Sequence, residues 1–284
     1  MSRHAIFVIN PSRAEAVTAA REISQILLKE GFTLSTPSEV GVLGISQMNA
    51  ESLATAEVVV VLGGDGTILR AAEIARGQNI PILGINLGHV GFLAEVEKPA
   101  PVEIAASIVA KDFVIENRMV LKYSVVRDDA VISAGWALNE VTVERDGTTM
   151  VELFVQIDNR PLSRWGCDGL ICSTPTGSTA YAFSAGGPVL WPEIDALVLL
   201  PISAHALFAR PMVVSPTSEI VVEIESTGAL LSGDSLRKLA LKAGDQVHIT
   251  KDASVIKLAH IKPTLFTDRL VAKFKLPVEG WRGE

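Results

Sequence analysis

Val58-Val59-Val60-Val61-Leu62 runs directly into Gly63-Gly64-Asp65-Gly66-Thr67. The five apolar residues predict a buried strand, and the following Ile68-Leu69-Arg70-Ala71-Ala72-Glu73-Ile74 predicts a helix. Glycines let a main chain approach a bulky anion closely, and amide groups at the start of a helix favour phosphate. The turn therefore predicts a phosphate loop, made by Gly63, Gly64, Gly66 and Thr67.

Asp65 is a lone carboxylate at the centre of this turn. A negative charge among phosphates is costly unless it has a task. It could hold Mg²⁺, or accept a proton from a hydroxyl that attacks phosphorus. The alternative is a plain strand-to-helix turn in which Asp65 is the N-cap. Two better-known phosphate loops are absent, because no Gly-Lys-Ser/Thr ending occurs and Leu69 stands where a dinucleotide fingerprint needs its third glycine.

Composition bounds the class of protein. The 284 residues allow two modest domains or one large one. A net charge of -7, with Lys and Arg scattered, argues against a nucleic-acid footprint. We see no signal-peptide pattern and no apolar stretch of membrane-spanning length, so we expect no membrane association and a cytoplasmic location. Cys167 and Cys172 are expected to be reduced thiols, and without a second Cys/His pair they do not predict a metal site.

The first part of the chain alternates strand and helix patterns. Apolar runs at 5–9, 58–62 and 81–86 predict strands, and a helix is expected where Val17, Ala20, Ile23 and Leu27 recur at helical spacing. Continuous apolar strands separated by helices indicate a parallel sheet that is covered on both faces. The glycine-rich loops at Gly63 and Gly88 both follow strands, so they should lie at the same edge of this sheet.

Alternation replaces helical periodicity near Arg118. Apolar and polar residues alternate around 121–125, 151–157, 220–224 and 247–249, with turn signals between them. This pattern predicts an antiparallel β domain over roughly residues 118–262. The domains are therefore expected at 1–117 and 118–262, followed by a tail, 263–284, in which 265–274 could form a short helix.

A second group of polar residues lies inside the β domain. A short strand, Leu170 to Cys172, leads into Ser173-Thr174-Pro175-Thr176-Gly177-Ser178-Thr179-Ala180-Tyr181. Hydroxyls and amides in such a loop suit phosphate, ribose or a base edge, and Tyr181 could stack on a ring. The alternative is a Ser/Thr-rich surface loop that caps a helix. Asn139-Glu140 could bind an adenine edge and a ribose hydroxyl, although polar pairs at strand ends are common.

Taken together, these motifs resemble the NAD kinases, over nearly the whole chain. The residues that carry the resemblance are Gly-Gly-Asp-Gly-Thr at 63–67, Asn-Leu-Gly-His-Val-Gly-Phe at 86–92, Asn-Glu at 139–140, Asp-Gly-Leu at 168–170, the loop 173–181 and Ser-Ala-Gly-Gly-Pro at 184–188. Diacylglycerol- and sphingosine-type lipid kinases share the first motif, whereas the 173–181 loop is far more specific. The end of the chain, 263–283, looks like the actinobacterial branch.

The resemblance implies an α/β N-terminal domain with a parallel sheet, an antiparallel β-sandwich C-terminal domain, a tail that returns to the first domain, and an active site in the cleft between the domains. The implied reaction phosphorylates the 2′-hydroxyl of the adenosine ribose of NAD to give NADP. It implies Mg²⁺ or another divalent cation, ATP or polyphosphate as phosphoryl donor, and a homo-oligomer, either a dimer or a tetramer. No residue is assigned as a metal ligand.

By the same resemblance Asp65 is the catalytic carboxylate. Asn139 resembles the adenine contact and Glu140 a ribose contact, while Asp168 would reach the dinucleotide near a subunit interface. The full set of implied NAD-binding residues is Asp65, Gly66, Arg70, Phe92, Asn139, Glu140, Asp168, Thr176, Thr179, Ala180, Tyr181, Ala182, Phe183 and Ser184.

One departure from the family pattern is Gly166, which stands two positions before Asp168 where many members carry a basic residue. This departure argues against a role for the segment in binding the pyrophosphate through a positive charge. His89 could lie near the site, and His205 either contacts the nicotinamide half or packs in an interface.

The remaining histidines, His4, His248 and His260, are expected to be structural or on the surface, and the sequence indicates no role for Asp234. Two other functions remain open. A lipid kinase would need an apolar groove and gives the 173–181 loop no role. A non-catalytic dinucleotide sensor would gain little from Asp65.

Overall fold

A computed structural model describes residues 3–37, 44–87, 91–94, 99–226, 228–262 and 264–278. The chain folds as two compact units. Unit 1 comprises 1–117 and 256–284, and unit 2 comprises 118–255. Residues 256–262, which the sequence pattern assigns to the β domain, therefore group with the first unit, together with the tail.

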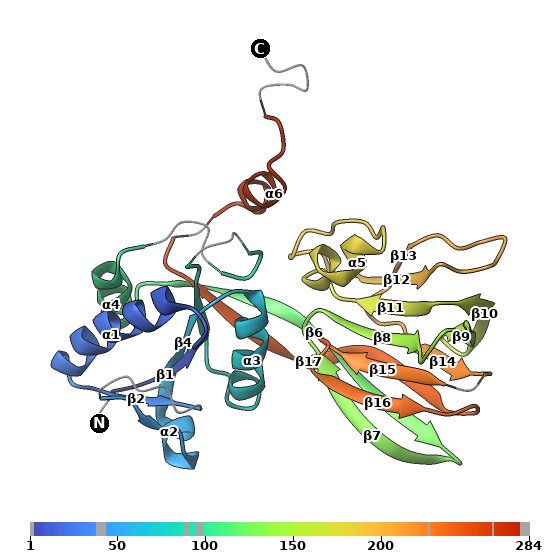
Figure 1. Ribbon diagram of the computed structural model, residues 1–284, viewed down its shortest axis with the longest axis horizontal. Helices are drawn as coiled ribbons and strands as arrows, with labels where there is room; N and C mark the ends of the chain where they lie inside the picture. Colours follow the sequence, from blue (N-terminus) through green and yellow to red (C-terminus); the bar gives the residue numbers. More distant parts are fainter. Residues whose placement is uncertain are drawn as a thin grey trace. The chain divides into compact units, whose positions relative to one another are not determined.

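Unit 1 contains a parallel sheet, drawn in blue and teal in Figure 1. Its order is β5-β4-β1-β2-β3, and the end of β17 lies beside β5. The pairs β1–β2, β1–β4, β4–β5, β2–β3 and β17–β5 are all parallel, as the continuous apolar runs predict. The strands are β1 (Arg3–Ile9), β2 (Phe32–Thr36), β3 (Ser46–Gln47), β4 (Ala56–Leu62) and β5 (Ile82–Ile85).

Helices flank this sheet. They are α1 (Ala14–Lys29), α2 (Ala50–Thr55), α3 (Asp65–Ala75), a 3-10 turn η1 (Arg76–Gln78) and α4 (Pro101–Ala110), and α6 (Phe266–Phe274) follows in the tail. The buried residues Ala16, Ala20, Ile23 and Leu27 of α1 share a core with Ile104 and Ile108 of α4 and with alternate residues of the strands. Figure 1 shows α1 and α4 side by side, with α3 apart from them. Gly84 makes room for α3, because a Cβ there would come 2.6 Å from the Cδ1 atom of Ile68.

Unit 2 contains two antiparallel layers. One has the order β10-β9-β14-β17, with β6 paired to β17 and β7 paired to β6, and the other has the order β13-β12-β11-β8-β15-β16. The strands are β6 (Val114–Arg127), β7 (Ala130–Ala137), β8 (Glu140–Arg145), β9 (Val151–Ile157), β10 (Arg160–Cys167), β11 (Gly169–Ser173), β12 (Leu197–Ile202), β13 (Met212–Val214), β14 (Ile220–Ile224), β15 (Ala229–Gly233), β16 (Arg237–Leu241) and β17 (Gln246–His260). The short elements η2 (Gly177–Thr179) and α5 (Tyr181–Ser184) follow β11.

The alternating residues of unit 2 build its core. Inward-facing side chains such as Leu121, Leu153 and Val222 are fully buried in one cluster that both layers share. Turn signals in the sequence mark real turns, since Asp158 and Asn159 have φ of 52° and 59°. The predicted two-domain architecture, α/β followed by an antiparallel sandwich, is confirmed.

Strand β17 is much longer than its sequence pattern indicates. Alternation is clear only at 247–249, yet the strand runs from Gln246 to His260. Its first part pairs with β14 of unit 2, and Leu258 and Ala259 pair with Ile82 and Leu83 of unit 1. One strand therefore contributes to the sheets of both units.

Candidate functional site

Asp65 is the first residue of α3 and lies just after β4. Its Oδ2 accepts a hydrogen bond from the backbone N–H of Phe92 at 3.1 Å, and its Oδ1 accepts one from Leu93 at 3.3 Å. The loop after β5 therefore meets the loop after β4, as the shared sheet edge predicts. The N-cap alternative is wrong, because the N-cap residue is Gly64 and no side chain caps the helix. The two hydrogen bonds from Phe92 and Leu93 instead fix the orientation of the Asp65 carboxylate.

Two glycines make this arrangement possible by their lack of a side chain. A Cβ on Gly91 would overlap the carboxylate of Asp65, and a Cβ on Gly63 would overlap the side chain of Thr67. Thr67 is buried, and its N–H donates to the Gly64 carbonyl at 2.8 Å. Gly63 and Gly91 are thus required for close packing around Asp65.

The remaining part of the turn is open. A Cβ on Gly64 or on Gly66 would meet nothing within 4 Å, and both Gly66 and Arg70 are exposed. The predicted phosphate-loop residues therefore divide into a packed pair, Gly63 and Thr67, and an accessible pair, Gly64 and Gly66. Arg70 lies one turn into α3, with its side chain in solvent.

Phe92 uses its backbone and its side chain in different ways. Its ring is 6% exposed and packs against Phe266 and Phe274 of α6, with ring centroids 5.9 and 5.7 Å apart. Its N–H holds Asp65, and its carbonyl oxygen accepts a hydrogen bond from Arg269. The ring is thus part of the packing of the tail helix, and its backbone belongs to the Asp65 site. The predicted loop residues Gly88 and His89 lie outside the described residues.

The hydroxyl-rich loop of unit 2 is mostly braced internally. Ser173, Thr174 and Ser178 are fully buried. The Thr174 hydroxyl donates to the Leu138 carbonyl at 2.6 Å, and the Ser178 hydroxyl donates to the Pro175 carbonyl at 2.7 Å. Most of the hydroxyls that suggested phosphate or ribose contacts are therefore used to hold the loop in shape.

The Asn139 carbonyl lies at the centre of this bracing. It accepts hydrogen bonds from the N–H of Thr174 at 2.9 Å and from the hydroxyl of Ser173 at 3.3 Å. Gly177 packs directly on it, so that a Cβ at 177 would overlap the carbonyl. Thr176 is 5% exposed, and Nη1 of the buried Arg118 lies 3.5 Å from its hydroxyl. The loop and Asn139 thus form one rigid piece.

The side chains that this loop offers to solvent come after it. Tyr181, Phe183 and Ser184 are exposed, whereas Thr179 and Ala180 are half-buried. The Tyr181 hydroxyl donates to Oε2 of Glu144 at 3.1 Å, which leaves the ring 38% exposed but tethered. Ala182 is fully buried in a small core with Ile171, Val198 and Leu200. Ala182 therefore supports the loop from below and offers no exposed surface to a ligand.

Asp234 is a buried acid that no sequence pattern singles out. It lies in the turn after β15 with φ of 52°, and it is 3% exposed. Its carboxylate accepts hydrogen bonds from the N–H groups of Leu138, Asn139 and Glu140, at 2.8, 2.7 and 3.4 Å. Asp234 therefore holds the Asn139-Glu140 segment. The only signal in the sequence is a Gly-Asp-Ser turn between alternating strands.

Glu140 is a strongly perturbed carboxyl group. Burial, and then the neighbouring charge of Asp234, raise the pKa of Glu140 to about 8, against a contact with the Tyr181 backbone N–H that lowers it. Burial likewise raises the pKa of Asp234 to about 6, although its three N–H donors oppose the shift. Among the described residues, Oε2 of Glu140 has no hydrogen-bond partner. A buried polar atom without a partner is rare in folded proteins, and carboxyl groups with strongly raised pKa values cluster at functional sites.

Asp168 already has a partner. Its Oδ1 lies 2.7 Å from Nε of Arg145 on the neighbouring strand β8. Both side chains are about one-third exposed. Arg145 thus supplies a positive charge next to the segment that lacks a basic residue at Gly166. The sequence did not indicate this pairing.

The two cysteines are buried, and His4 and His248 have side-chain hydrogen-bond partners. Cys167 and Cys172 are free thiols, as expected, and both are buried. Nε2 of His4 lies 2.8 Å from the Ser35 hydroxyl, and Nδ1 of His248 lies 3.0 Å from Glu219. The backbone N–H of the exposed His205 donates to the Gly166 carbonyl.

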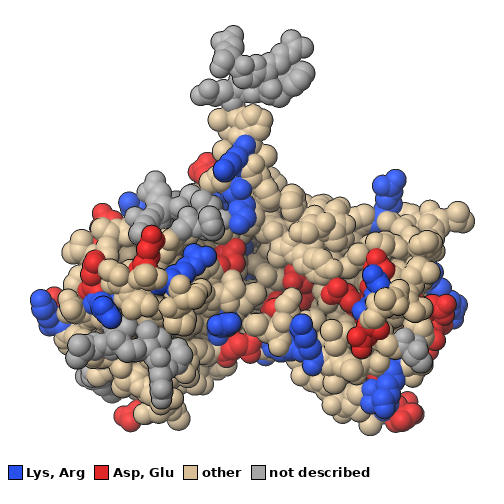
Figure 2. All heavy atoms as spheres, viewed as in Figure 1, with Lys and Arg blue, Asp and Glu red and all other residues tan. Residues whose placement is uncertain are grey.

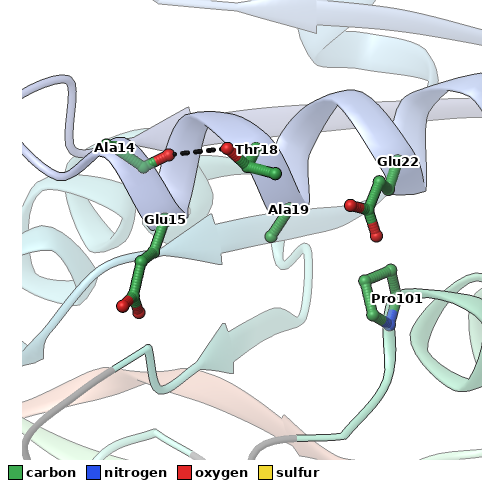
Figure 3. Close-up of a pocket in the computed structure, with 6 residues that line it drawn as sticks. All are labelled: Ala14, Glu15, Thr18, Ala19, Glu22 and Pro101. Atoms are coloured by element: carbon green, nitrogen blue, oxygen red, sulfur yellow. Dashed lines mark hydrogen bonds between the residues drawn. The ribbon is translucent and has the colours of Figure 1, made fainter.

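A hollow of about 420 Å³ lies elsewhere on unit 1 (Figure 3). It is lined by Ala14, Glu15, Thr18, Ala19 and Glu22 of α1 and by Pro101 at the start of α4. None of these residues belongs to the predicted site. Within the described part of the chain, no cluster of three or more His, Cys, Asp and Glu side chains could hold a metal ion.

Lys and Arg are interspersed with Asp and Glu on the face that Figure 2 shows. No helix of the described segments is long and apolar enough to cross a membrane.

Two family models match the chain, and they correspond to its two parts. Residues 5–113 match the ATP-NAD kinase N-terminal domain, and residues 138–261 match the ATP-NAD kinase C-terminal domain. The chain belongs to the NAD kinase family. The NAD kinase of Mycolicibacterium paratuberculosis is 45% identical over 99% of this chain and 98% of its own. The NAD kinase of Thermobifida fusca is 43% identical over 99% and 92%.

Solved NAD kinase structures share the fold. A crystal structure of an NAD kinase from Archaeoglobus fulgidus in complex with ATP has a TM-score of 0.71 at 27% identity, and the match covers 97% of this chain and 99% of that one. Yeast NADH kinase complexed with NADH has a TM-score of 0.83 at 23% identity, over 96% of this chain and 87% of that one. The second likeness concerns the fold alone.

Proposed function

We propose that this member of the NAD kinase family transfers a phosphoryl group to the 2′-hydroxyl of the adenosine ribose of NAD, giving NADP, with Asp65 as the catalytic base. The observation that carries this assignment is the carboxylate of Asp65, which two backbone N–H groups orient beside a glycine turn at the carboxyl edge of a parallel sheet. A half-exposed, oriented carboxylate next to helix-start amides suits a hydroxyl nucleophile and a phosphate together.

The reaction asks the chain for position and charge more than for covalent chemistry. The ribose oxygen attacks the terminal phosphorus of the donor, the bond from that phosphorus to the bridging oxygen breaks, and the hydroxyl proton passes to Asp65. The backbone amides of the turn at Gly64 and Gly66, where a Cβ would meet nothing within 4 Å, and the exposed Arg70 would bind the negative charge of the phosphates.

A divalent cation fits this site if the phosphates of the donor supply most of its ligands. No group of three or more His, Cys, Asp and Glu side chains among the described residues could hold a metal ion, and Asp65 is the carboxylate that the glycine turn itself carries. Mg²⁺ is commonly held by one or two carboxylates together with substrate phosphates and water, so the donor set is compatible with Mg²⁺ that arrives with the nucleotide. When bound, the cation would neutralise charge on the phosphates; Asp65 would be its protein ligand.

The NAD pocket is proposed to use residues that unit 2 holds rigidly. Asn139 would read the adenine edge and Glu140 a ribose hydroxyl, since Asp234 fixes both and Oε2 of Glu140 has no partner among the described residues. The exposed ring of Tyr181 would stack on a ring of NAD. Asp168, paired with Arg145, would contact the dinucleotide. The remaining proposed pocket residues are Thr176, Thr179, Ala180, Phe183 and Ser184.

ATP is the proposed phosphoryl donor, with polyphosphate as the alternative. The Archaeoglobus fulgidus relative was solved with ATP, which supports the first choice. The deciding experiment offers the purified protein NAD together with ATP, other nucleotides or polyphosphate, each with Mg²⁺, and measures NADP directly. Saturable NAD binding without NADP from any donor would favour a dinucleotide sensor instead. Phosphorylation of diacylglycerol in place of NAD would favour a lipid kinase.

We further propose a cytoplasmic homo-oligomer, a dimer or tetramer assembled through unit 2. Free buried thiols fit a reducing compartment. Leu207 and Phe208, in the segment after β12, are 111% and 54% exposed, so two adjacent large apolar side chains are available for a partner subunit to cover.

A further inference from the structure

Arg269 of the tail helix is buried at 3% exposure, although it carries a permanent charge. Its Nη1 donates to the carbonyl oxygens of Phe92 and Ala94, both at 3.0 Å. Its Nη2 lies 3.2 Å from Nδ1 of His260. A buried guanidinium is tolerated only when such partners satisfy it, so this position is specified closely by its surroundings.

The two carbonyls belong to the segment that holds Asp65. The carbonyl of Phe92 and the N–H of Leu93 are parts of one peptide group, which is planar and trans. At its oxygen this group accepts from Arg269, and at its nitrogen it donates to Oδ1 of Asp65. In a trans peptide the two bonds point in opposite directions. Rotation of this single plane would therefore break the bond to Arg269 and the bond to Asp65 together.

A second line of contacts holds Arg269 itself. Arginine only donates and an ionised carboxylate only accepts, so the positions of the donors and acceptors assign the protonation of His260. Its Nδ1 accepts from Arg269, and its Nε2 carries the proton and donates to Oε2 of Glu116 at 3.1 Å. Phe266 and Phe274, one near each end of α6, pack on the ring of Phe92. The tail helix thus contacts Phe92 twice, by packing on its ring and by a hydrogen bond to its carbonyl oxygen.

We propose that Arg269 is a positioning residue for phosphoryl transfer, which fixes the 92–93 peptide and through it the carboxylate of Asp65. This inference rests on the proposed role of Asp65 as the base. It makes the tail a working part of the site, since the hydrogen bonds run from Glu116 through His260 and Arg269 to the peptide that orients Asp65. Polarised chains of this kind strengthen each bond in them.

The test compares Arg269→Met with wild type by kcat and KM for NAD, using ATP and Mg²⁺. Arg269→Met keeps most of the length of the side chain and removes every donor. We expect kcat to fall by about 10–100-fold, as for a small misplacement of a reacting group, with KM for NAD within about twofold. Leu27→Ala, in the core of unit 1 between α1 and the sheet, is the matched control for lost stability. Assayed below its melting temperature, it should retain the wild-type kcat.

Coupling to Asp65 separates positioning from a general structural effect. In an Asp65→Asn background the added Arg269→Met should lower the residual rate by less than about twofold, because the group that Arg269 positions is already lost. Equal losses in both backgrounds would overturn the proposal.

If Arg269→Met does not fold, the Arg269→Lys variant is the test, because one ammonium group cannot replace the guanidinium that reaches both carbonyls and His260. A several-fold loss of kcat is then expected, and a folded Arg269→Lys with wild-type kcat overturns the inference.

The same set of variants separates this inference from the proposed function. A wild-type protein that forms no NADP, or an Asp65→Asn variant with normal turnover, removes the assignment of Asp65. An inactive Asp65→Asn beside a fully active Arg269→Met removes the role of Arg269 alone.

Discussion

Gly91 lies against the carboxylate of Asp65, so closely that any side chain at position 91 would overlap the carboxylate oxygens. The Gly-Phe pair at 91–92 is therefore matched to an acid in a distant loop of the sequence. Gly91→Ala should displace Asp65 and lower kcat on the order of 10²-fold, the effect of a misplacement of about 1 Å. Steady-state kinetics with NAD and ATP measure this loss. Gly77→Ala is the control, since a Cβ at Gly77 meets nothing within 4 Å, and equal effects of the two substitutions would contradict the prediction.

Asp65→Asn tests the base directly. The amide keeps the shape of the side chain but removes its basicity and charge, so turnover should fall by about 10²–10⁴. Its single oxygen can accept from only one of the N–H groups of Phe92 and Leu93, so the melting temperature should fall modestly while the protein still folds. NAD affinity should change little. Asp65→Ala loses no helix cap, since the N-cap is Gly64, but it leaves the N–H groups of the buried Phe92 and Leu93 without this acceptor and should cost about 1–3 kcal/mol of stability for each. Near-normal turnover by a folded Asp65→Asn enzyme would remove the catalytic assignment.

Tyr181→Ala should weaken the use of NAD chiefly through KM. Loss of a stacking ring costs on the order of 1–3 kcal/mol, a range measured for bases on aromatic side chains in nucleic-acid complexes. Tyr181→Phe is the matched control, because it keeps the ring and removes only the hydrogen bond to Glu144. An unchanged KM in a folded Tyr181→Ala protein would mean that the ring does not contact the substrate.

The raised pKa of Glu140 should make the free energy of unfolding depend on pH. Its pKa is about 8 in the folded chain and 4.5 ordinarily, so the folded state holds more protons than the unfolded state between these values. The free energy of unfolding should therefore fall as pH rises through this window and level off above about pH 8. Glu140→Gln should flatten the slope between about pH 6.5 and 8.5, above the pKa of about 6 of Asp234, and leave the variant more stable than wild type at the upper end.

Melting temperatures at several pH values measure this slope. Glu152→Gln is the control with the same change of charge at an exposed position. At about 1.4 kcal/mol for each pKa unit, the effect has an upper limit of several kcal/mol. Parallel curves for wild type and Glu140→Gln would show that Glu140 is ionised in the folded protein at neutral pH.

The exposed pair Leu207 and Phe208 should mark an assembly surface. Light scattering across micromolar concentrations should give a mass of at least twice the 30.3 kDa monomer. Leu207→Asp should shift the mass toward the monomer, whereas Val131→Asp, in the hairpin strand β7 and 64% exposed, should leave it unchanged. A monomeric mass for the wild-type protein at all concentrations would contradict the oligomer.

The features that depend on neighbours along the chain could be predicted from the sequence. The apolar run at 58–62, the helix after Gly66 and the alternation at 151–157 all form the expected elements, because burial periodicity is a local property. The meeting of the loops after β4 and β5 follows from a rule about sheet edges. The hydroxyl-rich loop stands out by its composition, but composition could not reveal that Ser173, Thr174 and Ser178 bond inward.

Partners that are distant in sequence escaped prediction. Asp234 is 94 to 96 residues from the N–H groups of Glu140 and Leu138 that it holds, and Arg269 is 177 residues from Phe92. An isolated Asp in a turn, or an Arg on a short helix, carries no periodic signal. The sequence predicts only a structural or surface position for His260, and the fold brings it between Glu116 and Arg269.

Strand β17 determines how the chain can be cut for expression. A fragment that ends at residue 117 would lose Leu258 and Ala259, which pair with β5. The fully buried strand β5 would then become an open apolar edge, and such edges recruit other chains and aggregate. A soluble version of unit 1 should instead fuse 1–117 to 256–284 through a short linker, which closes the sheet with its own last strand and keeps the tail helix.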